Sequence, residues 1–288
     1  MIFVFLWSTG FIFTKMGLPY AEPLAFLSLR FSIAAIILVV VQLFVAKSRR
    51  KSISLLEIFH SAIAGILLQA VYLGGVFSSI ALGIGAGLSA LIVGLQPLIT
   101  VVLASLWLKE SLTLQKITGI ALGLAGVALV ITERGQLDGE LSITGLLLCV
   151  ASLLGITIGA VYQKRFCSQT PLLPSVTVQY MASVAFLLPL ALMTESLHFD
   201  WQPRFIFSLA WLIIALSLGA VFILMWLIRK GEAGRVATLF YLVPPVVAIE
   251  AWILFDESVS AMLIVGTGLC IAGVAAVMLE QSRSQVES

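Results

Sequence analysis

The chain has 288 residues, of which 61% are hydrophobic and 10% are charged, and its formal net charge is +2. Soluble domains are roughly 45–50% apolar and about 25% charged, so a water-soluble fold would leave much of this apolar surface exposed. The mean hydropathy of +1.15 therefore excludes that class and indicates a protein of the lipid bilayer.

Apolar segments alternate with charged clusters along the chain, and each segment is close to the roughly 20 residues that a helix needs to cross the hydrocarbon core. The segments are 1–18, 24–46, 61–82, 86–108, 114–132, 143–163, 174–194, 205–228, 234–255 and 259–279. The period-two alternation of a transmembrane barrel is missing from them. Because backbone groups in lipid must bond within their own segment, the sequence predicts an all-α bundle of ten transmembrane helices.

Basic residues indicate the orientation of the bundle. With the N-terminus in the cytoplasm, twelve fall on the inner side: Lys47, Arg49, Arg50, Lys51, Lys109, Lys116, Lys164, Arg165, Arg229, Lys230, Arg235 and Arg283. The outer side receives four: Lys15, Arg30, Arg134 and Arg204. Inner loops of membrane proteins are enriched in Lys and Arg, so we expect an inner-membrane protein with both termini cytoplasmic. The opening MIFVFLW has no basic region before it, and we expect no cleaved signal peptide.

The sequence repeats itself at an offset of 147 residues. Residues 86–131 align with 233–278 without a gap, and 16 of the 46 positions are identical. The matches include prolines, glycines, glutamates and serines in register, which general hydrophobicity does not explain. A weaker match pairs LGGVF at 73–77 with LGAVF at 218–222.

The repeating unit contains five predicted spans. Because five is odd, the second copy must cross the membrane in the opposite sense to the first. The sequence thus predicts two inverted five-helix repeats, at 1–132 and 143–279, followed by a cytoplasmic tail at 280–288. Inverted repeats recur in secondary transporters, whose substrates bind near the membrane midplane between the halves.

Several motifs resemble the EamA branch of the drug/metabolite transporter superfamily. They are WSTGFIFTK at 7–15, AEPLAFLSLR at 21–30, AGLSALIVGLQP at 86–97, KESLTLQKITGIALGLAGVALV at 109–130, GRVATLFYLVPP at 234–245 and DESVSAMLIVGTGLCIAGVAAV at 256–277. The resemblance implies export of amino acids, other metabolites or drugs. It also implies that the first four helices of each half line the cavity while the fifth packs outside.

Charged residues inside a membrane span are costly and point to function. Three are candidates, namely Lys15, Arg30 and Glu250. Lys15 could instead extend to the headgroups. Glu250 replaces Leu103 of the first copy, so helix packing alone does not require it. We expect Arg30, or alternatively Lys15, to be its partner, either in a proton-coupling site or in a permanent ion pair; a bond to a nearby hydroxyl is a further alternative.

Other candidates are uncharged. Pro97, Pro244 and Pro245 predict either hinges or static kinks. Five polar residues are candidates for substrate binding, namely Tyr72, Gln96, Tyr162, Gln163 and Tyr241. Weaker candidates are Trp7, Gln179, Tyr180 and Trp226. Tyr and Trp also gather at the membrane interface without a role in binding. Small residues at close spacing predict helix packing and not a ligand site: Gly119, Gly123, Gly126, Gly266, Cys270 and Gly273.

Motifs for other chemistry are missing from the sequence. There is no GxxxxGK[ST] loop for ATP, and the two histidines, His60 and His198, form no HExxH pattern. We therefore expect no cofactor, no metal and no catalytic residue. The expected partners are a small solute and the bilayer, without nucleic acid, for a monomer or homodimer. The sequence predicts a secondary exporter. The alternatives are an uptake or exchange permease and an intramembrane enzyme.

Overall fold

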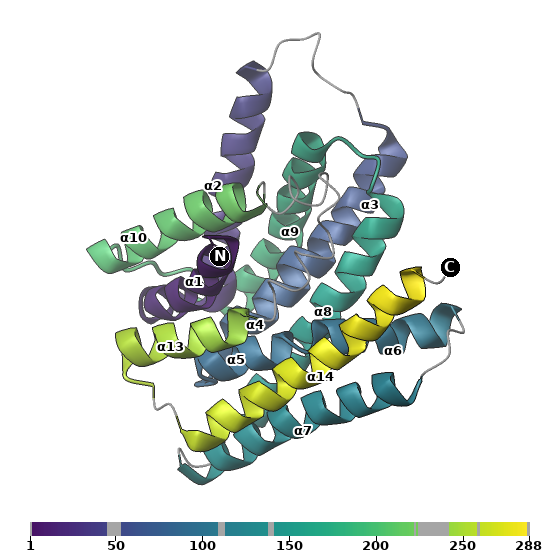
Figure 1. The fold of residues 1–288 in the computed structure, drawn as a ribbon. Helices are drawn as coiled ribbons and strands as arrows, with labels where there is room; N and C mark the ends of the chain where they lie inside the picture. The colour runs from purple at the N-terminus through teal and green to yellow at the C-terminus, as the bar shows by residue number, and fades with distance from the viewer. Residues whose placement is uncertain are drawn as a thin grey trace.

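A computed structural model describes residues 2–44, 53–108, 113–137, 141–221, 223, 242–257 and 260–286. These residues fold almost entirely into helices (Figure 1). The helices are α1 (Ile2–Gly17), α2 (Pro23–Phe44), α3 (Leu55–Gly65), α4 (Tyr72–Ala81), α5 (Ala86–Val93), α6 (Gln96–Leu108), α7 (Leu114–Leu137), α8 (Ile143–Phe166), α9 (Leu172–Thr194), α10 (Pro203–Trp211), α13 (Val243–Phe255) and α14 (Ala261–Val286). Ala21 and Phe199 form an isolated β-bridge between two loops.

Eight helical stretches of the described chain are long and apolar enough to cross a membrane. Large hydrophobic side chains such as Leu147 and Ile264 lie exposed on them, as expected of surfaces that face lipid. The prediction of an all-helical membrane protein is confirmed. The two other predicted spans correspond to α1, which has 16 residues, and to α13, which has 13.

Helix boundaries follow local signals that the apolar pattern does not carry. The predicted span 61–82 in fact begins at Leu55, because Ser54 and Glu57 form a capping box. The Ser54 backbone N–H donates to the Glu57 carboxylate at 2.8 Å, and the Glu57 N–H donates to the Ser54 hydroxyl at 3.2 Å. These two bonds satisfy backbone donors that a helix start otherwise leaves unpaired.

Two of the long helical stretches contain π-helical segments. One, Ile66–Val71, joins α3 to α4, and the other, Leu212–Ala220, continues α10. Residues of α9 bond to carbonyls at both: Ser183 donates its hydroxyl to Gly65 O at 3.0 Å, and Tyr180 donates to Ser217 O at 2.7 Å. Such segments often accompany functional sites. The first one leads directly into Tyr72.

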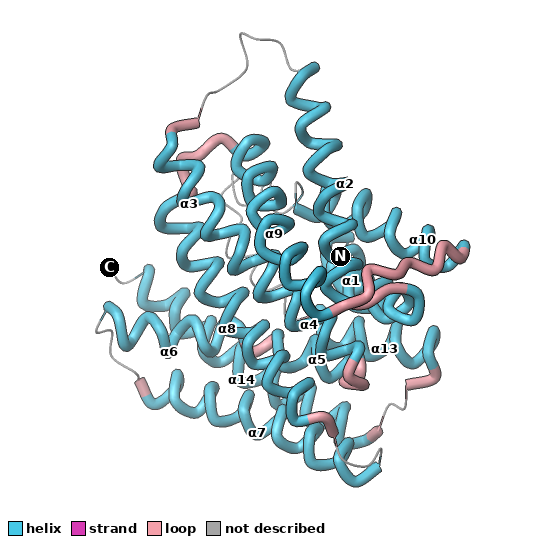
Figure 2. The backbone as a smooth tube through the Cα atoms, turned by 180° about the vertical axis from the view of Figure 1, so that it is seen from behind, coloured by secondary structure: helices cyan, strands magenta, loops and turns pink. Residues whose placement is uncertain are grey.

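Helices α7 and α14 lie side by side along one edge of the molecule in both views (Figures 1 and 2). Their closest contacts involve four glycines. A Cβ atom added to Gly119 would lie 2.6 Å from the Gly273 carbonyl oxygen, and one added to Gly126 would lie 2.4 Å from that of Gly266. The glycines therefore let the two backbones touch, which confirms the packing role predicted for them.

The ends of α7 and α14 are joined by side-chain bonds. Near the start of α7 the Thr113 hydroxyl donates to Glu280 of α14. Just before α14 the Ser260 hydroxyl donates to Glu133 of α7. Because the start of each helix meets the far part of the other, the two helices run antiparallel.

Candidate functional site

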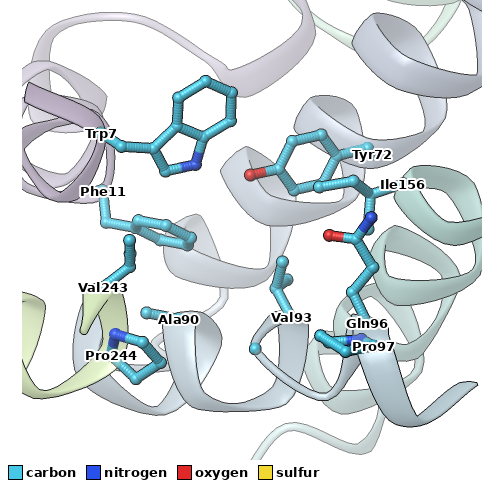
Figure 3. A pocket seen from close by; sticks show the side chains of 11 residues that line it. Trp7, Phe11, Tyr72, Ala90, Val93, Gln96, Pro97, Ile156, Val243 and Pro244 are labelled. Carbon is cyan, nitrogen blue, oxygen red and sulfur yellow. The ribbon is translucent and has the colours of Figure 1, made fainter. Parts of the chain in front are cut away.

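A pocket lies where helices from distant parts of the chain converge, and it contains about 380 Å³ of space including its open part (Figure 3). Its walls come from α1, α4, α5, α6, α8 and α13. The residues that line it are Trp7, Phe11, Tyr72, Ala90, Val93, Gly94, Gln96, Pro97, Ile156, Val243 and Pro244. Apolar and aromatic walls with a few polar groups are typical of sites for small organic ligands.

A break in the predicted span 86–108 shapes one wall of the pocket. Helix α5 ends at Val93, and α6 starts again at Gln96, with Pro97 in its first turn. Gly94, in the break, is close to α13: an added Cβ would lie 2.9 Å from Cγ of Pro244. Pro97 and Pro244 thus both line the pocket, and Gln96 enters it from the first turn of α6.

The proline pair of the second repeat lies at the start of a described helix. A hinge or a static kink within the span 234–255 was expected, and Pro244 and Pro245 stand in the first turn of α13, which begins at Val243. Proline fits there because the first-turn N–H groups have no partner within the helix. Within the described chain, these prolines therefore start a helix and do not bend one. Tyr241 and Trp226 lie outside the described residues.

Polar groups in the pocket are few and neutral. Figure 3 shows the Tyr72 hydroxyl and the Gln96 amide facing the same space, with Trp7 across from them. The structure therefore brings two of the predicted site residues together in one pocket. None of the residues found to line it is charged.

Arg30 is buried, with 5% of its surface exposed, and its partner is not the predicted Glu250. Its Nε donates to the Ser217 hydroxyl at 3.0 Å, and the Ser217 carbonyl accepts from Tyr180. The guanidinium thus lies against the π-helical segment after α10. The pairing expected from the sequence fails because both residues were placed only by depth, and depth does not specify which helix faces which.

Glu250 instead faces α1. Its Oε1 atom accepts from the Ser8 hydroxyl at 2.9 Å, while Oε2 is buried and has no hydrogen-bond partner in the described chain. Ser8 is fully buried and follows Trp7, which lines the pocket. The hydroxyl alternative is therefore the one that the structure contains.

Lys15 pairs with Glu257, a residue that the site prediction missed. The Lys15 Nζ lies 2.5 Å from Glu257 Oε1, and the Ala86 N–H at the start of α5 donates to the same oxygen at 3.1 Å. The Phe255 ring lies 4.8 Å from Nζ. One carboxylate thus links α1, α5 and the end of α13. Glu257 lies between the predicted spans 234–255 and 259–279, on the side to which Lys15 is also predicted, and this shared side was the available signal.

Tyr162 and Gln163 lie away from the pocket, near the end of α8. The Tyr162 hydroxyl is 2.7 Å from His60 Nδ1, and the His60 ring stacks on Phe166 with 4.7 Å between centroids. Gln163 accepts the N–H of Cys167 through its backbone carbonyl. The structure therefore separates these two candidates from Tyr72 and Gln96.

An all-helical bundle with membrane-spanning helices around an aromatic pocket is the architecture of a multi-pass membrane transport protein. A family comparison specifies the group: the chain belongs to the EamA-like transporter family, whose model matches residues 1–132 and 143–279.

Similar proteins are named as transporters. An uncharacterized transporter of Bacillus subtilis, YvbV, is 31% identical over 274 residues, covering 94% of this chain and 87% of the relative. A probable amino-acid metabolite efflux pump of Salmonella typhimurium is 25% identical, covering 95% and 91%. A solved crystal structure matches with a TM-score of 0.64 at 20% identity, covering 100% of this chain and 96% of the other, which is a likeness of fold.

Proposed function

We propose that this protein is a secondary transporter that exports amino acids or related amphipathic solutes across the inner membrane by alternating access. The observation that carries the proposal is the pocket, whose walls come from both sequence repeats. Trp7, Tyr72 and Gln96 belong to the first repeat, and Ile156 and Pro244 to the second. A site between two repeats can be exposed to either side when one repeat moves against the other.

The pattern of contacts between α7 and α14 supports an inverted repeat. Under the offset of 147, Gly119 corresponds to Gly266 and Gly126 to Gly273. The correspondence turns one contact into the other: Gly119 meets Gly273, and their equivalents, Gly266 and Gly126, meet each other. This reciprocity is what a two-fold axis produces at an interface.

The end contacts of the same helices follow the same rule. Thr113 corresponds to Ser260, and Glu133 to Glu280, and the bonds join Thr113 to Glu280 and Ser260 to Glu133. Cys270 bonds through Sγ to the carbonyl of Gly123, its own equivalent, at 3.3 Å, as a residue on the axis would. An axis relating antiparallel membrane helices lies in the membrane plane. This supports two inverted five-helix halves, ten helices in all. An even number of spans leaves both termini on one side, and the distribution of Lys and Arg supports the cytoplasm as that side.

The pocket chemistry supports an amphipathic substrate. Trp7 and Phe11 offer flat apolar surface, while Tyr72 and Gln96 offer a donor and an acceptor to a polar group. The proposed export direction and the amino-acid class rest on the name of the relatives, a probable amino-acid metabolite efflux pump. Proton entry is the proposed driving force, with Glu250 as the coupling group and Arg30 and Lys15 as supporting charges. Pro97 and Pro244 are the proposed hinges.

Purified protein in liposomes tests the proposal. Vesicles loaded with a radiolabelled amino acid should exchange it for unlabelled substrate, and a pH gradient should drive net movement. Tyr72→Phe combined with Gln96→Leu should lower exchange without loss of folded protein. Absence of exchange, uptake or efflux for every amino acid and related solute would overturn the proposal, and a hydrolytic product would indicate an enzyme. Net uptake only would favour a permease of the same fold.

A further inference from the structure

Ser8 contacts two acceptors with one hydrogen. Its hydroxyl oxygen lies 2.8 Å from the Phe5 carbonyl oxygen and 2.9 Å from Glu250 Oε1. A hydroxyl has a single O–H and can donate to only one of the two at a time. If Ser8 donates to Phe5, its contact with Glu250 is a hydrogen bond only when Glu250 carries a proton and donates it to Ser8.

The geometry therefore has two consistent forms. In the first, Glu250 is ionised, and the Ser8 hydrogen points to Oε1. In the second, a proton taken from water forms an O–H bond at Oε1, this group donates to Ser8 Oγ, and the Ser8 hydrogen turns to Phe5 O. The change adds one proton to the site and moves no other atom far.

Burial favours the second form. Oε2 of Glu250 is buried, and within the described chain no donor reaches it. A buried ionised oxygen without a donor is costly, whereas the carbonyl oxygen of a neutral acid loses much less. Ser8 lies wholly inside the protein, so its hydroxyl is not bonded to bulk water.

Few charges lie on the elements that pack against this site. Helices α1 and α5 pack on α13. The only charged residue of α1 is Lys15, which is paired with Glu257, and α5 has none. Asp256 and Glu257 directly follow α13 in the sequence, and Asp256 is exposed. No cation is bonded to Glu250 within the described residues.

We propose that Ser8 and Glu250 together form the proton-binding site of the transporter, with Ser8 as a positioning residue whose hydroxyl turns between Glu250 and the α1 backbone as the proton binds and leaves. The site joins α1 to α13 next to Trp7, so the proton state is communicated to a helix that lines the pocket. This inference rests on the proposed function for its physiological meaning, but the site itself can be tested without any substrate.

Infrared difference spectroscopy of the purified protein, recorded while the pH is stepped, tests the site directly. Wild-type protein should show a protonated carboxyl band that Glu250→Gln abolishes. Ser8→Ala should shift the frequency of that band and raise the midpoint of its titration by roughly half a pH unit or more, because a hydrogen bond to the ionised acid is stronger than one to the neutral acid. Ser8→Thr keeps the hydroxyl and should restore both values.

Thr14→Val is the matched control, because Thr14 is also buried on α1 and donates to a backbone carbonyl, that of Gly10, but it touches no carboxylate. It should leave the band unchanged. If Ser8→Ala does not fold, Ser8→Cys, a poor donor of similar size, is measured in its place. A band that survives Glu250→Gln, or one that Ser8 variants and Thr14→Val affect equally, overturns the proposal. If the wild-type protein shows the Ser8-sensitive band but transports no solute, the result counts against the proposed function and not against the site.

Discussion

Lys15 Nζ and Glu257 Oε1 lie 2.5 Å apart and join the C-terminal end of α1 to the second residue after α13. The same carboxylate accepts the first N–H of α5 at 3.1 Å. Along α1 and α13, the stretch between the pocket residues and this pair holds buried apolar side chains, among them Ile12, Val247 and Ala251. The pair therefore closes the end of the bundle that the charge distribution assigns to the outer side.

Glu257→Gln should loosen this closed end. Glutamine still accepts from Ala86, so the variant removes the ion pair alone. The pair is partly exposed, with 30% and 13% of the two side chains accessible, so the effect is limited to about 1 kcal/mol or a few-fold change. A cysteine placed at Ala251, in a background without Cys149, Cys167 and Cys270, should react about three- to five-fold faster with an impermeant thiol reagent added outside.

Exchanging the charges, with Lys15→Glu and Glu257→Lys together, should restore slow labelling. Glu195→Gln is the control: Glu195 accepts from the N–H groups of Leu24 and Ala25 and does not join α1 to α13. Equal labelling in wild type, in Glu257→Gln and in the exchanged pair would show that the ion pair does not hold this end shut.

Tyr72 and Gln96 should contribute separately to substrate binding. Tyr72→Phe removes one hydroxyl from the pocket, and Gln96→Leu replaces the amide by an apolar group of similar size. Each should weaken binding about five- to ten-fold, because a neutral hydrogen bond contributes about 1 kcal/mol. Equilibrium binding of labelled substrate to purified protein measures the change. Gln163→Leu, away from the pocket, should leave affinity unchanged, and a loss there equal to that of Gln96→Leu would contradict this assignment of the site.

Most of the helical architecture could be predicted from the sequence because a bilayer demands long apolar segments. The repeat offset also predicted which small residues pack, since Gly119 and Gly126 have counterparts at Gly266 and Gly273. Helix starts were harder. The start of α3 depends on two polar residues, Ser54 and Glu57, outside the apolar run.

The partners of the buried charges could not be predicted in the same way. Sequence gives the depth of Arg30, Glu250 and Lys15 in the membrane, but not the rotation of each helix about its axis. Arg30 bonds to Ser217, which lies in a π-helical segment. A π-helical turn holds more residues than an α-helical turn, so the side chains that face Arg30 are not the ones that a periodicity of 3.6 predicts. The offset of 147 residues makes Glu257 the counterpart of Glu110, but it does not indicate that Glu257 pairs with Lys15.

Glu22, just before α2, should stabilise the protein at neutral pH by binding Ser196 in the loop after α9, and this stabilisation should be lost in acid. The Ser196 hydroxyl and backbone N–H both donate to its carboxylate, at 2.6 and 2.5 Å, and these bonds lower the pKa of Glu22 below its usual 4.5. A lowered pKa gives stabilisation that is complete above 4.5 and disappears as the pH falls through the folded-state value.

The melting temperatures of wild type and Glu22→Gln, compared over a series of pH values, check this expectation. Wild type should melt slightly higher at neutral pH, and the two curves should converge below pH 4.5. Ser196→Ala should give a smaller difference of the same sign, because the backbone donor remains. A difference that grows as the pH falls would refute the assignment.

The glycine contacts of α7 and α14 allow a test of the proposed symmetry. A Cβ on Gly126 would lie 2.4 Å from the Gly266 carbonyl oxygen, and one on Gly266 would lie 2.6 Å from that of Gly126. Backbone atoms cannot yield as a flexible side chain can, so the helices must separate. Gly126→Ala and Gly266→Ala should each lower the free energy of unfolding by about 1–3 kcal/mol, and Gly119→Ala and Gly273→Ala should behave as the equivalent pair.

Gly268→Ala on α14 is the control, because an added Cβ there meets nothing within 4 Å. It should change stability by no more than about 0.5 kcal/mol. Chemical unfolding of the purified protein in mild detergent measures all five variants. Alanine at the two glycines of one helix could lower the free energy of unfolding while alanine at their equivalents on the other helix does not. The two helices would then not contribute equally to the contact. The two-fold relation between the halves would then lose its main structural support, because these contacts are the ones that the relation exchanges: Gly119 with Gly273, and their equivalents Gly266 with Gly126.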